Sequence, residues 1–273
     1  MLTGIRVLNL GINVPGAVAG ARLRELGAEV TKLEPPAGDP TEVAAPDWYA
    51  ALVEGQSVRV VDLKAGLPRD ELAATDLLLT SSRPAALERL GLGWDALHAA
   101  YPRLAHVAIV GHAPPADGEP GHDLTYTGAH GLLAPPLLPR TLLADLGGAE
   151  RAVSTALALL LARERTGEGA RVEVALADAA EAFAAPLRHG LTTPGGWLGG
   201  GYPFYGLYRA SDGWLALAAL EPHFRDRLLA ELGLEEATHD VLGEIFGGRS
   251  TAAWDAWARE RDLPLAPVAQ TAE

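Results

Sequence analysis

The middle of the chain carries a histidine, His122, and an aspartate, Asp145, whose side chains are suited to moving protons. An imidazole and a carboxylate can both take up and release a proton near neutral pH, provided that partial burial raises the pKa of the carboxyl group. Asp145 precedes a helical pattern that starts near Gly147, so the N–H groups at that helix end could stabilise a developing negative charge. Each residue also has an ordinary explanation, His122 as a hydrogen-bonded loop residue and Asp145 as the N-cap of the helix.

Other kinds of catalytic chemistry find no support in the sequence. The chain has no cysteine, which rules out disulfides, thiolate metal sites and cysteine nucleophiles. It has no G-x-S-x-G motif, and its histidines do not have the spacing of metal ligands. Gly11, Gly16 and Gly20 do not form the G-x-G-x-x-G fingerprint, so no nicotinamide dinucleotide is expected. We therefore predict neither a metal nor an organic cofactor.

The composition limits the size of the fold and the class of partner. The 273 residues are 48% hydrophobic and 21% charged, enough to build one large domain or two domains that share an interface. The formal charge of −13 argues against nucleic acid and anionic membranes as partners. The first eleven residues, MLTGIRVLNLG, do not have the pattern of a signal peptide, and the most apolar helical stretch, 153–162, is too short to span a bilayer. We expect a cytoplasmic protein.

Alternating strand and helix patterns fill the first two thirds of the chain. A short apolar run at 5–10 is followed by a helical pattern that closes at Gly27 and by a second strand at 29–33, which together form a β-α-β unit. Three more strands, separated by helical patterns, are expected at 57–62, 76–81 and 104–110. This order predicts an α/β fold with a parallel, Rossmann-like sheet in a large domain over 1–190. Ligands of such sheets bind beyond the carboxyl ends of the strands.

The last third of the chain has a different pattern. Residues 191–202 are rich in glycine, with three in a row at 199–201, and are interpreted as a linker. Two strands at 205–210 and 214–219 then flank Ser-Asp-Gly, which predicts a hairpin, and helical patterns follow. We expect a small α+β domain over 203–273.

Several stretches, in the same order along the chain, resemble CoA-transferase family III, the group that includes the α-methylacyl-CoA racemases. The most specific is LLARERTGEGARVEVALADA (160–179), and the others lie at 26–40, 60–64, 83–93, 102–111 and 263–268. Three short motifs are similar to the racemase branch: GHDL (121–124), LADLGG (143–148) and ALEPHF (219–224). The resemblance implies an interlocked homodimer, in which each active site combines the large domain of one chain with the small domain of the other.

The resemblance also implies roles for particular residues. His122 and Asp145 would be the proton-transfer pair, and Glu221 would support the site from the small domain. The substrate would be an acyl-CoA thioester, which carries its own coenzyme A. The remaining candidates would bind the CoA moiety (Arg83, Lys32 and Arg89) or line the acyl pocket (Tyr126, Gly147 and Gly148).

Ordinary alternatives stay open for some of these residues. Glu221 precedes Pro222 at the start of a helical pattern, where an acidic residue needs no further explanation. Arg83 could be a solvated loop residue, and Tyr126 could be part of the core. Two departures from the family also matter. Relatives continue beyond 263–268 with a segment that returns to the large domain, so we expect a weaker interlock or a more open acyl pocket here. They also usually carry Asn, Arg and Lys in the stretch corresponding to 53–60, near the CoA nucleotide.

Three activities fit these features. A racemase of 2-methylacyl thioesters needs two groups of similar basicity on opposite sides of the α-carbon, one protonated when the other is not. A CoA-transferase would instead use Asp145 as a nucleophile, which passes through a mixed anhydride and an aspartyl-CoA thioester. A catalytically silent relative would bind CoA without turnover. His122 favours proton transfer.

Overall fold

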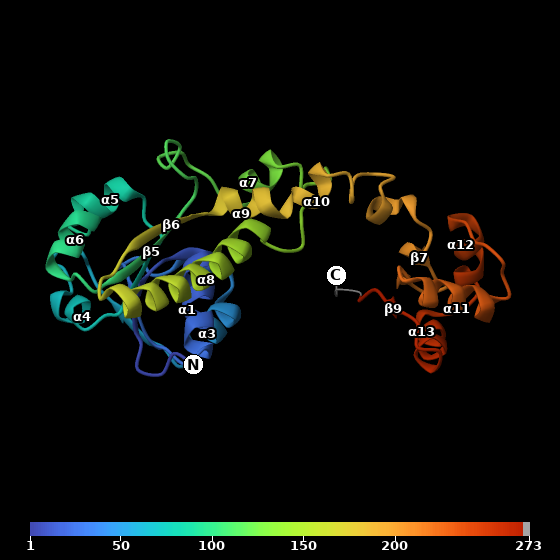
Figure 1. The fold of residues 1–273 in the computed structure, drawn as a ribbon, viewed down its shortest axis with the longest axis horizontal. Helices are drawn as coiled ribbons and strands as arrows, with labels where there is room; N and C mark the ends of the chain where they lie inside the picture. Colours follow the sequence, from blue (N-terminus) through green and yellow to red (C-terminus); the bar gives the residue numbers. More distant parts are fainter. Residues whose placement is uncertain (270–273) are drawn as a thin grey trace. The chain divides into compact units, whose positions relative to one another are not determined.

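The computed structural model describes residues 1–269, which form two compact units (Figure 1). The first unit runs from Met1 to Ala184, and the second begins at Ala185. The stretch 191–202, interpreted as a linker, belongs to the second unit and contains a short π-helical turn, η1 (Trp197–Gly201).

The first unit is built on a six-stranded parallel sheet with the order β3-β2-β1-β4-β5-β6. The predicted α/β fold with a parallel, Rossmann-like sheet is therefore confirmed. From the centre of the sheet, β1, β2 and β3 follow one another towards one edge, and β4, β5 and β6 follow one another towards the other edge. The direction in which strands are added therefore reverses between β1 and β4. The strands are β1 (Arg6–Leu10), β2 (Glu29–Glu34), β3 (Ser57–Val60), β4 (Leu77–Thr80), β5 (Ala105–Val110) and β6 (Arg171–Ala175).

Helices cover both faces of this sheet. Neighbouring strand residues point to opposite faces, so Val7 joins one buried cluster and Leu8 joins another. The cluster around Val7 packs under α1 (Asn13–Glu25) and α8 (Leu143–Thr166), with α3 (Pro46–Val53) beside α1. The cluster around Leu8 packs under α4 (Arg69–Ala73), α5 (Pro84–Arg89) and α6 (Trp94–Ala100). The remaining helices of the first unit are α2 (Pro40–Ala44), α7 (Asp123–Ala129) and α9 (Leu176–Phe183).

The second unit confirms the predicted hairpin. Strands β7 (Tyr205–Arg209) and β8 (Trp214–Ala218) are antiparallel, and β9 (Leu265–Pro267) pairs with the other edge of β8. Its core centres on Trp254, whose indole N–H donates a hydrogen bond of 2.8 Å to the carbonyl of Phe246. The helices are α10 (Ala185–Arg188), α11 (Pro222–Leu232), α12 (His239–Gly247) and α13 (Thr251–Glu260).

A fully buried histidine in the first unit predicts sensitivity to acid. His106 on β5 lies opposite Arg171 of β6, and its Nε2 is 3.0 Å from Thr80 Oγ1. Burial, followed by the charge of Arg171, lowers the pKa of His106 to about 3. Because an unfolded histidine binds a proton near pH 6.5, the unfolded state gains protons first as the pH falls from about 6.5 towards 3. The folded state therefore loses stability across this window.

Replacing His106 by glutamine is expected to remove much of this loss. Glutamine keeps a hydrogen-bonding group for Thr80 and does not titrate. A shift of this size corresponds to roughly 4 kcal/mol of unfolding free energy between neutral pH and pH 3. Urea unfolding of both proteins at pH 7.5, 5 and 4 measures the difference. An unchanged pH dependence in the variant would show that other groups control the acid sensitivity.

Candidate active site

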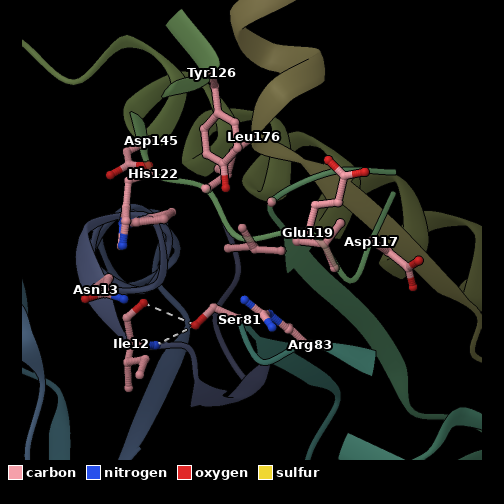
Figure 2. A pocket seen from close by; sticks show the side chains of 15 residues that line it. Ile12, Asn13, Ser81, Arg83, Asp117, Glu119, His122, Tyr126, Asp145 and Leu176 are labelled. Atoms are coloured by element: carbon pink, nitrogen blue, oxygen red, sulfur yellow. Dashed lines mark hydrogen bonds between the residues drawn. The ribbon is translucent and has the colours of Figure 1, made fainter. Parts of the chain in front are cut away.

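A cavity of about 150 Å³ lies at the carboxyl ends of β1, β4 and β5 (Figure 2). This is the point where the strand order reverses, which is the usual ligand site of open α/β sheets. The wall combines apolar and ionisable side chains. It is formed by Ile12, Asn13, Pro15, Ser81, Arg83, Ile109, Val110, Gly111, Asp117, Glu119, Gly121, His122, Tyr126, Asp145 and Leu176.

The structure brings His122 and Asp145 to the same cavity (Figure 2). His122 is the residue before α7, and its N–H donates a hydrogen bond of 3.0 Å to Thr125 Oγ1. Asp145 is the third residue of α8, because that helix begins at Leu143. The expected helix start near Gly147 and the N-cap alternative for Asp145 are therefore wrong. The N-terminal ends of two helices instead present the two side chains to the same cavity.

The surroundings of Asp145 raise the pKa of its carboxyl group to about 6. Burial is the main cause, the nearby charge of Asp123 adds to it, and His122 opposes it. The raised pKa lies close to the ordinary value for a histidine side chain, about 6.5. Asp145 is therefore poised to exchange protons at neutral pH, as the sequence chemistry requires.

Asp123 is a member of the site that the sequence analysis did not select. It is only 4% exposed, and its Oδ1 accepts a hydrogen bond of 3.0 Å from the backbone N–H of Asp145. Its other oxygen, Oδ2, is buried and has no hydrogen-bond partner among residues 1–269. In the sequence, the feature that points to Asp123 is its position directly after His122. Asp123 thus fixes the first turn of α8 and places a second negative charge beside Asp145.

Replacing Asp123 by asparagine is expected to lower the pKa of Asp145. The amide oxygen can still accept the hydrogen bond from Asp145 N–H, whereas the negative charge that disfavours a second carboxylate is lost. We expect the Asp145 titration to move down by about one pH unit. A ¹³C NMR titration of labelled aspartate carboxyl groups measures this shift. A titration that stays in place would mean that burial alone sets the pKa.

Tyr126 lines the cavity, and it is also tightly packed. It is 3% exposed, and a Cβ added to Gly111 or Gly121 would come within 2.5 or 2.4 Å of its side chain. Gly147 and Gly148 do not line this cavity. A Cβ on either would lie 2.2 Å from a side chain of α9, from Phe183 or Leu176 respectively, so these glycines let α9 pack closely on α8.

The three residues predicted to bind CoA have different environments. Arg83 is exposed on the cavity wall at the start of α5, and Arg89 is exposed at the end of the same helix. The side chain of Lys32 is 0% exposed, and its ammonium group lies 2.8 Å from Asp39 Oδ2. A side chain with no exposed surface cannot contact coenzyme A, so the prediction for Lys32 does not fit the structure.

A second cavity, of about 480 Å³, lies beside the first and shares Ile12 with it. It is formed at the ends of β1, β2 and β3 by two loop segments, 34–37 and 61–64, together with Ser82 and Leu90. Its lining is largely apolar and includes one lysine, Lys64. The two neighbouring cavities offer room for an extended ligand.

Glu221 belongs to the second unit. It is exposed and occupies the N-cap position of α11, where its side chain makes no capping hydrogen bond. Its role in a site stays a prediction. Within residues 1–269 the structure has no cluster of three or more histidine or acidic side chains that could hold a metal ion. No helix in that range is long and apolar enough to cross a membrane.

Comparisons with known proteins bear on the family and the fold. The sequence profile of CoA-transferase family III matches residues 2–273. The α-methylacyl-CoA racemase of Homo sapiens is 31% identical over 98% of this chain and 77% of its own length. The cinnamoyl-CoA:phenyllactate CoA-transferase of Clostridium sporogenes is 27% identical over 100% of this chain and 79% of its own. A CaiB/BaiF family protein from Brucella suis has the same fold, with a TM-score of 0.83 at 23% identity, over 98% of this chain and 84% of that structure.

Proposed function

The chain belongs to CoA-transferase family III, and from this premise we propose that it is an α-methylacyl-CoA racemase-like enzyme. It interconverts the epimers of 2-methylacyl-CoA thioesters by moving the α-proton between two groups. The observation that carries the proposal is the raised pKa of Asp145, about 6, in the same cavity as His122. Two bases of similar strength are what a reaction with nearly equal forward and reverse steps requires.

The reaction assigns a separate task to each side chain. One of the pair, as the free base, takes the α-proton from one face of the substrate, and the electrons of the C–H bond form an enolate. The other, in its protonated form, returns a proton to the opposite face. The enolate oxygen needs a hydrogen-bond donor that is already in place. The N–H of Asp145 already donates to Asp123 and so is not available for this task.

The two cavities accommodate the two halves of the substrate. We propose that the acyl group and thioester lie in the smaller cavity, with the α-carbon between His122 and Asp145, and that the nucleotide end of CoA lies in the larger one. Arg83 and Lys64 are the basic side chains on this path that could bind a polyanionic ligand. The same two cavities are also lined by acidic residues: Asp117, Glu119, Glu34 and Asp62. The interlocked homodimer, with Glu221 contributed by the small domain, is part of this proposal, and sedimentation analysis tests it.

A CoA-transferase is the second candidate, since several of the similar proteins are named as CoA-transferases. In that scheme the carboxylate of Asp145 attacks the thioester carbon and CoA leaves as the thiolate, which gives a mixed anhydride. The thiolate then attacks the aspartyl carbonyl and releases the acyl group as a carboxylate. A second carboxylate takes the CoA by the reverse steps.

Incubation of the wild-type protein with one epimer of a 2-methylacyl-CoA separates these schemes. The racemase proposal predicts formation of the other epimer without any acceptor carboxylate. The transferase scheme predicts that added carboxylates receive CoA and that hydroxylamine traps the aspartyl intermediate. CoA binding without either reaction would identify a silent relative, and the absence of CoA binding would contradict the whole proposal.

A further inference from the structure

The loop between β1 and α1 ends in an uncommon backbone conformation. Asn13 has a φ of 63°, and among residues 1–269 the one other non-glycine residue with positive φ is Asp262, at 51°. A left-handed backbone is unfavourable for residues with a side chain, and it persists where the surroundings fix it. Asparagine tolerates a positive φ better than most residues, so the conformation alone does not indicate a function. The contacts around the loop have to be considered with it.

Side chains from distant parts of the chain hold the first two residues of this loop. The N–H of Gly11 donates to Asn9 Oδ1 at 2.8 Å. Ser81, at the end of β4, accepts from the N–H of Ile12 at 2.8 Å and donates to its carbonyl at 3.1 Å. Both residues that precede Asn13, Gly11 and Ile12, are therefore held by side-chain hydrogen bonds.

The buried ion pair of Lys32 and Asp39 completes this support. Lys32 Nζ donates to the carbonyl of Gly11 at 2.8 Å, and Asp39 Oδ1 accepts from the N–H of Asn13 at 3.0 Å. Both charged side chains are 0% exposed, so the pair is stable only with its hydrogen bonds in place. The backbone from Gly11 N–H to Asn13 N–H thus has a side-chain partner for each polar group, and Asn13 is held rigidly.

This support aims the side chain of Asn13 at the reaction site. Asn13 lines the smaller cavity, on the same side as His122 and Asp145 (Figure 2). Its amide group has no hydrogen-bond partner within residues 1–269, although an amide nitrogen can donate two hydrogen bonds. A side-chain donor without a partner among the described residues, carried by a hydrogen-bonded backbone beside the proton-transfer pair, matches the donor that an enolate requires.

We infer that the side-chain amide of Asn13 donates a hydrogen bond to the carbonyl oxygen of the bound acyl thioester. The inference rests on the proposed function and adds a residue to it. As the base removes the α-proton, the C–H electron pair forms the Cα–C1 double bond and the carbonyl π electrons move to the oxygen. The hydrogen bond from Asn13 strengthens at that moment, and the reverse shift follows when the second group returns a proton.

A variant that relaxes the backbone tests this role without weakening the fold. Glycine adopts a positive φ at no cost, so Asn13→Gly keeps the loop and removes the amide. Asp262→Gly is the matched control, since it makes the same backbone change at an exposed residue of the second unit. The probes are acetyl-CoA and its ethyl thioether analogue, which lacks the carbonyl oxygen, with affinities measured by calorimetry.

The expected result is that the wild type and Asp262→Gly prefer acetyl-CoA over the thioether, and that Asn13→Gly loses this preference. We expect acetyl-CoA to bind about tenfold more weakly to Asn13→Gly and the thioether to bind unchanged. Turnover of a 2-methylacyl-CoA should fall by about 10²- to 10³-fold in kcat, with the melting temperature equal or higher. An unchanged preference in Asn13→Gly would overturn the inference while leaving the proposed function in place. A wild-type protein that binds neither probe would contradict the proposed function itself, and the inference with it.

Discussion

Replacing Asp145 by asparagine is expected to lower the rate of epimerisation by about 10³- to 10⁴-fold, at the upper end of what general acid–base groups contribute. Asparagine keeps the size of the side chain and cannot take up a proton at neutral pH. The cavity, the apolar wall and the first turn of α8 all stay in place. The loss therefore falls on the chemical step, and kcat should drop far more than the affinity for CoA.

The same substitution is expected to stabilise the fold at neutral and alkaline pH. The pKa of Asp145 is raised in the folded state, from 3.8 to about 6, so ionising this carboxyl group costs the folded state more than the unfolded state. This cost develops as the pH rises from about 4 to 6 and is fully present above that range. Removing it should add roughly 3 kcal/mol to the unfolding free energy at pH 8 and nothing at pH 3. Urea unfolding at the two pH values measures this, and a destabilised variant would mean that the Asp145 carboxylate has a structural role.

Replacing His122 by glutamine is expected to lower the rate of epimerisation by about 10²- to 10⁴-fold. Exchange of the α-proton through Asp145 alone should survive. Asp145 still faces the substrate, so it can exchange the α-proton of one epimer with solvent. The His122 side chain is exposed, so the unfolding free energy of the variant should stay within about 0.5 kcal/mol of the wild-type value.

The readout for His122→Gln is deuterium uptake from each pure epimer, measured separately. Uptake from one epimer only, without formation of the other, supports two bases on opposite faces. The transferase scheme predicts that His122→Gln retains CoA transfer to an added carboxylate, because Asp145 alone is the nucleophile there. The two schemes thus give opposite results with the same protein.

The centre of the sheet could be predicted from the sequence because β1, β4 and β5 are short, largely apolar runs that are buried on both faces. Val7 and Leu8 enter different clusters, as do Leu77 and Leu78, and such strands have no polar face to obscure the pattern. The resemblance to the family then located His122, Asp145 and Tyr126, which the fold gathers in one cavity.

The errors at the site have local physical causes. The start of α8 was placed too late because Leu142 carries no capping side chain and the glycines after Asp145 imitate a helix start. Those glycines serve helix packing, which depends on Phe183 and Leu176, far away in the sequence. The burial of Lys32 cannot be predicted from the sequence because its partner, Asp39, lies on the following loop, and only the fold shows that both side chains are buried. The backbone angle of Asn13 leaves no trace in a single sequence.

The most direct test of the central claim is deuterium incorporation at Cα of an (S)-2-methylacyl-CoA in D₂O, with the (R) product followed at the same time. The wild type, His122→Ala and Asp145→Ala should be compared at pH 7.5, with CoA binding as the control. We expect deuterated (R) thioester with the wild type and none with either variant, although all three bind CoA. Absence of exchange in a wild type that binds CoA, or epimerisation that survives in either variant, would contradict the two-base assignment.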